Sequence, residues 1–299
     1  MKFFITGCES FVAKNLIKEL EKKKYDYFGV DYNCKNTKKT KRIDIRSKKI
    51  LKYIPYGSIV VHLAALSTNE ECNKDLSNTI DVNLNGTINL AIQSKKKNVK
   101  QFIFASSEWV YGDVDNNQEQ RENDKINILN MKSHYALSKI AGESFLINNS
   151  QLNNLMILRF GIIFSDRSDK RGSALEKLFY EVKNKNEVKV GSKKTGRKFI
   201  HIADIISGII KSSKKRGVHI LNLTGNKLIT LDEIIKKSSN VLKKKIILKE
   251  IDSGNFSIRK PSNKKAKKIL NWEPKIDLKK GINILKNKLW LAFYKSSLI

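Results

Sequence analysis

The sequence has few cysteines and no long apolar run, and each shortage excludes a class of protein. Cys8, Cys34 and Cys72 are far apart and form no CxxC pair, which argues against a disulfide framework and against a metal site. No stretch approaches the roughly 18 apolar residues that a membrane helix needs. The apolar start Phe3–Ile5 is too short for a secretory signal. We therefore expect a cytoplasmic protein with reduced thiols, no metal and no membrane partner.

Prolines and flexible linkers are also scarce. Only Pro55, Pro261 and Pro274 occur, and no Gly/Ser-rich linker divides the chain. The 299 residues, of which 40% are hydrophobic, suffice for one large domain or two smaller units that share a core. Two free-standing domains are therefore not expected.

Arginine is scarce although the chain is basic. The net charge of +30 comes from 59 basic and 29 acidic residues, yet only nine of the basic residues are Arg. Base readout relies on the bidentate Arg fork, and no run of Lys exceeds three. We expect no nucleic-acid partner, although binding of nucleic acid through the net charge stays an alternative. The charge favours an anionic small-molecule substrate.

Short apolar runs alternate with amphipathic stretches over the first half of the chain. The expected strands are Lys2–Thr6, Tyr27–Asp31, Ser58–Leu63, Gln101–Ser107 and Leu155–Phe160, and the expected helices are Val12–Lys24, Asn78–Lys97 and Ser133–Asn148. Further on, we expect a helix at Asp204–Ser213, a strand at Ile220–Leu223 and a helix from Leu231. This alternation predicts an α/β fold with a doubly wound parallel sheet, that is, a Rossmann domain.

The turn after the first expected strand is typical of a dinucleotide site. Gly7 ends the strand, and the helix that follows would present the backbone N–H groups of Phe11 and Val12 to a pyrophosphate. The usual motif has glycine where this chain has Ser10 and Ala13. Ala13 still allows close packing, and the Ser10 hydroxyl can donate to a phosphate. An ordinary strand–helix turn is the alternative interpretation.

An acid at the end of the second strand indicates which dinucleotide binds. Asp31 lies 24 positions after Gly7, where a carboxylate accepts hydrogen bonds from ribose hydroxyls and repels a 2′-phosphate. This favours NAD over NADP. The alternative interpretation is that Asp31 only caps a helix.

Three residues form a candidate catalytic group. Tyr135 and Lys139 are four positions apart and so share one helix face, and Ser107 ends the strand that precedes that helix. A phenol with a pKa near 10 is a poor base at neutral pH, but a nearby ammonium and a cationic nicotinamide both stabilise the phenolate. Ser107 would hydrogen-bond the reacting oxygen.

With these motifs the chain resembles the extended short-chain dehydrogenase/reductases, and within them the NAD-dependent sugar-nucleotide epimerases and dehydratases. The stretches that carry the resemblance are Thr6–Ala13, Asp44-Ile45, His62–Ala65, Asp81–Thr87, Ser107–Gly112, Tyr135–Lys139, Gly196–Asp204, Arg259–Pro261 and Lys265–Pro274. The last of them is particularly similar to UDP-sugar epimerases and UDP-glucuronate decarboxylases.

The resemblance implies a role for further residues. Those assigned to the cofactor are Asp44 and Ile45 beside the adenine, Leu63, Ala64 and Ala65 along the phosphates and ribose, Phe160 beside the nicotinamide, and Asn83. Those assigned to the substrate are Ser107, Glu108, Trp109, Arg197 and Arg259, of which the two arginines would clamp a diphosphate. The resemblance also implies an NAD-binding Rossmann domain at 1–160 and a smaller mixed α/β substrate domain at 161–299, with a segment near 198–215 returning to the first. It further implies a homodimer formed through the helices at Asn78–Lys97 and Ser133–Asn148.

The sequence also departs from the family. Ile162 stands where Asn is common, and Phe164-Ser165 replace Tyr-Gly. Dehydratases carry Asp and Glu after the catalytic hydroxyl residue, and this chain has Glu108 and Trp109 there. Because Trp cannot abstract a proton, standard dehydration is disfavoured. Decarboxylation is disfavoured as well, because the decarboxylases have Glu at the Trp109 position.

The sequence therefore predicts an NAD-dependent C4 epimerase of a nucleotide sugar that works through a transient 4-keto intermediate. Alternatives are a 4-keto-sugar reductase, a decarboxylase or dehydratase of the same family, and a non-catalytic relative that binds the cofactor.

Overall fold

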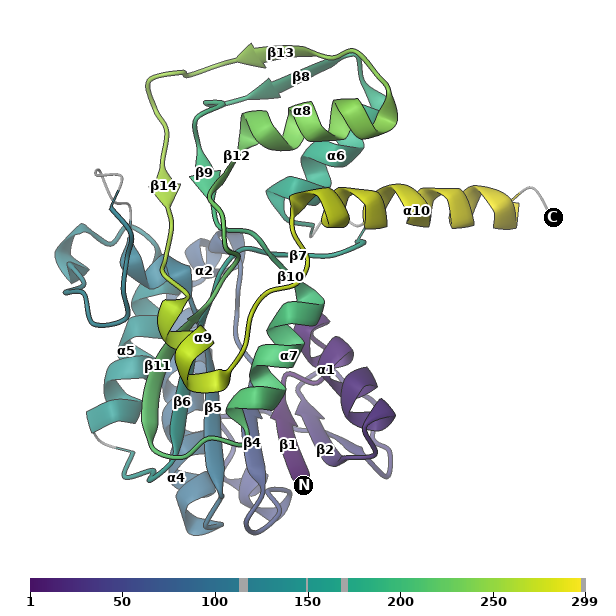
Figure 1. Ribbon diagram of the computed structural model, residues 1–299. Helices are drawn as coiled ribbons and strands as arrows, with labels where there is room; N and C mark the ends of the chain where they lie inside the picture. The colour runs from purple at the N-terminus through teal and green to yellow at the C-terminus, as the bar shows by residue number, and fades with distance from the viewer. Residues whose placement is uncertain (113–117, 149, 168–171, 297–299) are drawn as a thin grey trace.

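A seven-stranded parallel sheet forms the centre of the molecule. The computed structural model describes residues 1–112, 118–148, 150–167 and 172–296. The strand order is β11-β6-β5-β4-β1-β2-β3, and all the pairings in this sheet are parallel (Figure 1). Its strands are β1 (Lys2–Thr6), β2 (Asp26–Asp31), β3 (Thr40–Arg42), β4 (Ile59–His62), β5 (Gln101–Ser107), β6 (Leu155–Phe160) and β11 (Val218–Leu223). This is the doubly wound α/β fold that the sequence predicts.

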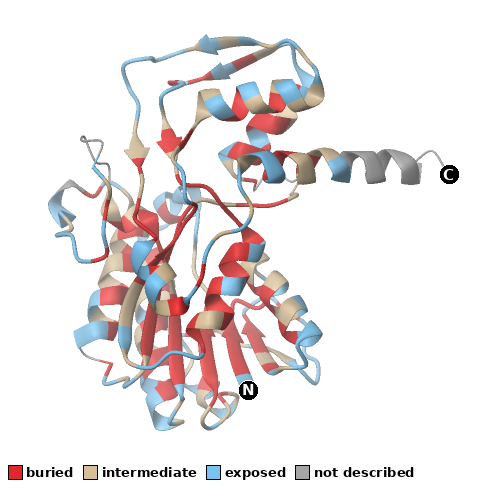
Figure 2. Cartoon of the chain, viewed as in Figure 1, coloured by how far each residue is buried: buried red, intermediate tan, exposed pale blue. Residues whose placement is uncertain are grey.

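Helices cover both faces of this sheet, so its strands are apolar on both sides. Phe3 and Ile5 belong to one hydrophobic cluster and Phe4 to the other, and all three are fully buried. In Figure 2 the central strands are mostly red, the colour of buried residues. The first face is covered by α1 (Phe11–Lys22), α7 (Ile202–Ser212) and α9 (Lys264–Leu270), and the second by α4 (Gly86–Lys96) and α5 (His134–Asn148).

A smaller lobe of helices and short strands lies beyond the carboxyl ends of the central strands (Figure 1). Its elements are β7 (Ile163–Phe164), α6 (Ala174–Asn184), β8 (Glu187–Val190), β9 (Gly196–Arg197), β10 (Ile200–His201), β12 (Ile229–Thr230), α8 (Leu231–Leu242), β13 (Ile247–Glu250), β14 (Ile258–Arg259) and α10 (Leu278–Ser296). Phe164, Phe179 and Ile234 belong to a third hydrophobic cluster, separate from the two that line the sheet.

The helix expected at Asn78–Lys97 is helical throughout but not uniform. It consists of α3 (Leu76–Ile80), a π-helical turn η2 (Asp81–Asn85) and α4, and a short α2 (Asn69–Lys74) precedes it. The described 3₁₀ turns are η1 (Lys48–Lys52), η3 (Glu108–Tyr111) and η4 (Ile128–Asn130). π-turns inside helices are frequent at functional sites.

Among the described helices, none combines the length and the apolar character that crossing a membrane requires.

Candidate active site

The region beyond the carboxyl ends of β1 and β4, which we call the crevice, lies where the strand order reverses. The chain runs outward to β2 and β3 on one side of β1, and to β5, β6 and β11 on the other, so the order reverses between these two strands. In open α/β sheets, ligands bind at the carboxyl ends of the strands at this switch point. The predicted residues Gly7 and Leu63 directly follow the two strands.

Gly7 allows the two strand ends to approach each other closely. Its φ is +67°, and a Cβ atom on it would lie 2.8 Å from the backbone of Ala64. The Thr6 hydroxyl also accepts a hydrogen bond from the Ala64 N–H, at 3.3 Å. A larger residue at position 7 would therefore separate the loops that border the crevice.

Ser10 caps helix α1. Its Oγ accepts a hydrogen bond from the Ala13 N–H at 3.3 Å, as an N-cap does. The N–H groups of Phe11 and Val12, in the first turn of the helix, have no partner within the helix and are available to an anion. The guanidinium of Arg167 also lies at this end, 4.1 Å from the centroid of the Phe11 ring, and its Nε pairs with Glu176 at 3.4 Å. Sequence reasoning missed Arg167, although it is one of only nine arginines.

Asp31 lies beside the same turn. Its carboxylate accepts hydrogen bonds from the N–H groups of Glu9 (3.1 Å) and Asn33 (3.0 Å), which fix its position at the end of β2. A carboxylate has about four acceptor positions, so two stay available for ribose hydroxyls.

Asp44 and Ile45 lie further along the same side. Asp44 is bonded to Arg46, which lowers the pKa of the carboxyl group. Ile45 packs against Gly86 at the start of α4, where a Cβ atom would lie 2.6 Å from the Ile45 side chain.

Asn83 positions other parts of the crevice. It lies in the π-turn η2, and its Nδ2 donates to the Ser138 hydroxyl and to the Leu66 carbonyl at 3.0 Å each. Its Oδ1 accepts from the Leu66 N–H at 2.8 Å. The side chain therefore ties the segment after β4, which contains Ala65, to helix α5.

Ser107, Tyr135 and Lys139 lie together at the carboxyl end of β5. Ser107 hydrogen-bonds the Tyr135 phenol, and the Lys139 ammonium lies 5.7 Å from the centroid of the Tyr135 ring. Burial raises the pKa of Tyr135 to about 12, and the bond to Ser107 acts in the opposite direction. Burial lowers the pKa of Lys139 to about 8. Phe160 pairs in register with Ser107 and so lies at the same edge.

The two predicted substrate arginines are neighbours, although 62 positions separate them. Arg197 and Arg259 are register partners in the parallel strands β9 and β14. Their Nε atoms lie 3.8 and 3.9 Å from the same oxygen of Glu108, the residue after Ser107. Arg259 also stacks on Trp109, with 4.1 Å between its guanidinium and the ring.

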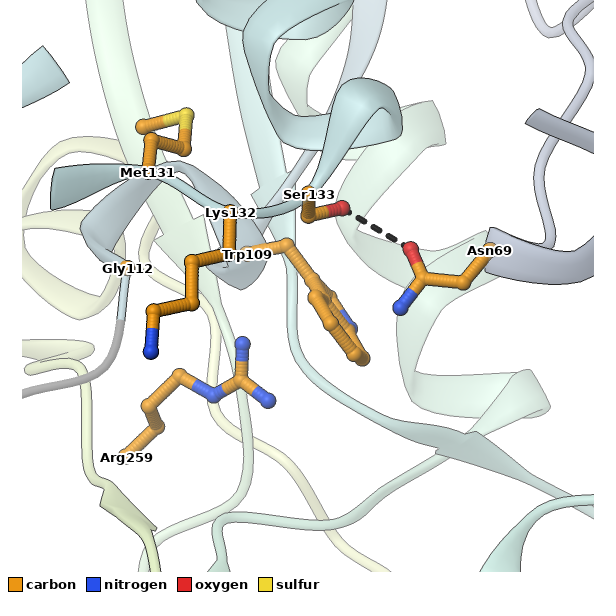
Figure 3. Close-up of a pocket in the computed structure, with 7 residues that line it drawn as sticks. All are labelled: Asn69, Trp109, Gly112, Met131, Lys132, Ser133 and Arg259. Atoms are coloured by element: carbon orange, nitrogen blue, oxygen red, sulfur yellow. Dashed lines mark hydrogen bonds between the residues drawn. The ribbon is translucent and has the colours of Figure 1, made fainter. Parts of the chain in front are cut away.

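A cavity of about 180 Å³ lies next to this group (Figure 3). Its lining residues are Asn69, Trp109, Gly112, Met131, Lys132, Ser133 and Arg259. Trp109 and Arg259 come from the sequence prediction. The others were not predicted as site residues: Met131, Lys132 and Ser133 lie in a loop, Asn69 begins α2, and Gly112 ends the Ser107–Gly112 stretch without an assigned role. Ser133 donates a hydrogen bond to Asn69 at 2.8 Å across the cavity wall, as Figure 3 shows.

Two buried histidines have structural partners. His62 bonds the hydroxyls of Thr6 (2.8 Å) and Thr87 (2.9 Å), and burial lowers its pKa to about 3. His201 caps α7 by accepting from the Ala203 N–H. Within the described ranges, no cluster of three or more His, Cys, Asp or Glu residues is arranged to hold a metal ion.

Known proteins share both the sequence pattern and the fold. The UDP-glucuronate 4-epimerase of Thermodesulfobacterium geofontis is 27% identical over 94% of this chain and 93% of its own length. UDP-glucuronic acid decarboxylase 1 of Arabidopsis thaliana is 23% identical over 94% of this chain and 68% of its own length. The crystal structure of the UDP-glucose 4-epimerase of Thermotoga maritima with UDP-glucose superposes with a TM-score of 0.83, at 20% identity and full coverage of both chains.

Residues 3–223 match the model of one protein family, and they include the crevice, the Ser107–Tyr135–Lys139 group and Arg197. The chain belongs to the NAD dependent epimerase/dehydratase family.

Proposed function

We propose that this chain is an NAD-dependent enzyme that inverts C4 of a nucleotide sugar through a transient 4-keto sugar. The observation that carries the proposal is the group at the end of β5, where the Tyr135 phenol is bonded to Ser107 and lies close to Lys139. This is an acid–base pair with an orienting hydroxyl, at the edge of the sheet where α/β enzymes bind their ligands.

The residues around the crevice fit a dinucleotide. A diphosphate fits beside the close approach at Gly7 and the N–H groups at the start of α1. A ribose diol fits the spare acceptor positions of Asp31. The residues proposed to hold NAD are Gly7, Ser10, Phe11, Val12, Asp31, Asp44, Ile45, Leu63, Ala64, Ala65, Asn83, Tyr135, Lys139 and Phe160. Of these, Ser10 and Asn83 act by holding the turn and the loop in place, since their side chains bond to the protein.

Each catalytic residue has one task. Once bound, NAD would supply reversible hydride transfer at the sugar carbon. Tyr135 removes the proton of the C4 hydroxyl and later gives it back. Lys139 stabilises the phenolate and holds ribose hydroxyls, and Ser107 donates a hydrogen bond to the developing ketone. Inversion at C4 requires the keto sugar to rotate in the site, and the overall reaction involves no net oxidation.

The substrate side is formed by the smaller lobe. Arg197 and Arg259 would bind the diphosphate, and Trp109 would border the sugar. Because Trp109 is an indole stacked on Arg259, it supplies no carboxylate for decarboxylation or standard dehydration. We accordingly propose cofactor binding by residues 1–160, supplemented by the segment near 198–215, and substrate binding mainly by residues 161–299.

NMR of the purified protein with a panel of nucleotide sugars, with and without added NAD, tests the function. Appearance of the C4 epimer without consumption of external nicotinamide is the expected result. Stoichiometric use of NADH would indicate a reductase instead, and no conversion of any sugar would contradict an enzymatic role.

The variant Tyr135→Phe tests the role of the phenol. We expect turnover to fall by roughly 10²- to 10⁴-fold, because the residue that transfers the proton is lost. Bound NAD, measured by absorbance after denaturation, should stay close to the wild-type amount. Near-wild-type turnover would contradict the assignment.

We also propose a homodimer, which sedimentation velocity at micromolar concentration would detect. Ile92 on α4 and Ile147 on α5 are exposed apolar residues on the helices that the resemblance assigns to the interface. Monomer alone would contradict it. The cytoplasmic location stays a prediction from the cysteine content.

A further inference from the structure

Glu108 is a buried carboxylate whose hydrogen bonds are missing. Its side chain has no exposure to solvent, and neither oxygen has a hydrogen-bond partner among the described residues. The Nε of Arg259, 3.9 Å away, is buried and likewise lacks a hydrogen bond in that part of the chain. A buried polar group without a partner is costly, so this arrangement requires an explanation.

The explanation begins with the register of β9 and β14. Because Arg197 and Arg259 are register partners in parallel strands, their side chains leave the sheet on the same side. Glu108 supplies a negative charge beside these two cations. The Arg197 guanidinium is also held by the carbonyls of Gly196 and Ser257 and by the Ser257 hydroxyl, at 2.6–2.7 Å.

Most of the other ionisable groups near Glu108 are engaged elsewhere. Helix α5 packs against the turn that carries Glu108 and bears His134, Tyr135, Lys139 and Glu143, of which the buried His134 Nδ1 has no hydrogen-bond partner among the described residues. Glu143 is bonded to Arg159, Tyr135 to Ser107, and Lys139 lies over Phe104. Tyr111, on the turn of Glu108 itself, is bonded to Arg159. The charges that act on the Glu108 carboxyl group are those of Arg259 and Arg197.

A diphosphate with two negative charges would compete with Glu108 for both arginines. Were Glu108 to stay ionised, it and the diphosphate would bring three negative charges to the two arginines, and the Glu108 carboxylate is itself fully buried. If Glu108 takes up one proton, two positive charges face two negative ones. We propose that Glu108 is the internal counter-ion of Arg197 and Arg259, and that it binds a proton from solvent when the diphosphate of a nucleotide sugar occupies them.

This inference rests on the proposed function and adds to it a coupling between substrate and proton. The pKa values support it: burial raises the pKa of Glu108 to about 7, while Arg259 and Arg197 act in the opposite direction. A diphosphate that neutralises the arginines would cancel their effect and raise the pKa of Glu108 further. Above pH 7, Glu108 would be largely ionised in the free protein and protonated in the complex.

Titration calorimetry of the NAD-loaded full chain tests the coupling. UDP-glucose, TDP-glucose and GDP-glucose are titrated at pH 8 in HEPES and in Tris, whose different ionisation enthalpies reveal proton uptake. We expect the wild type to take up roughly one proton per sugar nucleotide bound, and its affinity to fall about tenfold per pH unit above pH 7.

Two variants complete the experiment. Glu108→Gln should bind without proton uptake and with an affinity nearly independent of pH. Glu119→Gln, which removes a carboxylate that pairs instead with Lys198, should keep the wild-type uptake. Thermal unfolding verifies that both variants fold.

The outcomes separate this inference from the proposed function. Binding by the wild type without proton uptake, or uptake that persists in Glu108→Gln, overturns the inference and leaves the epimerase proposal intact. Absence of binding by all three nucleotides overturns both.

Discussion

Two buried pairings of glutamate with arginine in this molecule differ in one respect, which is hydrogen bonding. In the first, the Arg159 Nη2 lies 2.7 Å from the Glu143 Oε2, and Nε donates to Oε1 at 3.1 Å. Ser106 donates to the same carboxylate, and Tyr111 accepts from Arg159 at 3.0 Å. In the second, Glu108 lies 3.8 and 3.9 Å from the arginine nitrogens and makes no hydrogen bond within the described ranges.

The difference separates a structural pair from a pair that is ready for a ligand. A buried ion pair is tolerated when further hydrogen bonds satisfy its remaining atoms, as they do for Glu143. The Glu108 group lacks such bonds and lies next to the cavity that Arg259 lines. It therefore carries a cost in the free protein, which on the proposal above is relieved when a diphosphate binds the arginines and Glu108 takes up a proton.

Breaking the hydrogen-bonded pair of Glu143 and Arg159 should have the largest effect on stability. Glu143→Leu leaves Arg159 buried without a counter-ion, so we expect a loss of about 3–5 kcal/mol in the free energy of unfolding. Urea denaturation measures it. Glu181→Leu, which breaks an exposed pair with Lys185, is the control and should cost less than about 1 kcal/mol. Similar losses in both variants would remove the distinction between a buried pair and a surface pair.

Neutralising the Glu108 carboxylate should change the stability in a way that depends on pH. Because the folded-state pKa of Glu108 is raised to about 7, its favourable contribution is present below its ordinary pKa and is lost as the pH rises through 7. Relative to wild type, Glu108→Gln should therefore gain about 3 kcal/mol in the free energy of unfolding between pH 4.5 and pH 8.

Denaturation of both proteins across this pH range gives the difference directly. A stability difference that stays the same across this range would mean that the Glu108 carboxylate is satisfied after all, and the comparison between the two pairs would fail.

Removing the Tyr111 hydroxyl, which bonds to Arg159 of the first pair, should have the smallest effect on stability. Tyr111 accepts from Arg159 and donates to Asn222 at 2.8 Å, so Tyr111→Phe should cost about 1–2 kcal/mol in unfolding free energy. Tyr56→Phe, an exposed tyrosine bonded to Asn98, should be close to neutral. A neutral Tyr111→Phe would show that Arg159 is satisfied by Glu143 alone.

The central sheet could be predicted because its strands are continuous apolar runs. Gln101–Ser107 and Leu155–Phe160 have the predicted bounds, since both faces of these strands are buried and each strand is an almost uninterrupted apolar run. The two-residue strands β9 and β14 could not be predicted, because a periodicity of two needs more than two residues. The π-turn η2 was missed as well, since its bonds to Leu66 and Ser138 come from distant parts of the chain.

The candidate site also has a part that the sequence predicts and a part that it does not. The sequence alone determined what is local: a Gly7 turn after a strand, an acid at Asp31, and a Tyr135–Lys139 pair on one helical face. Only the tertiary structure decided that Arg197 and Arg259 are neighbours with Glu108 between them. The physical reason is that backbone preference and helical spacing act over a few residues, whereas the charge around a buried group depends on which distant strands are packed against it.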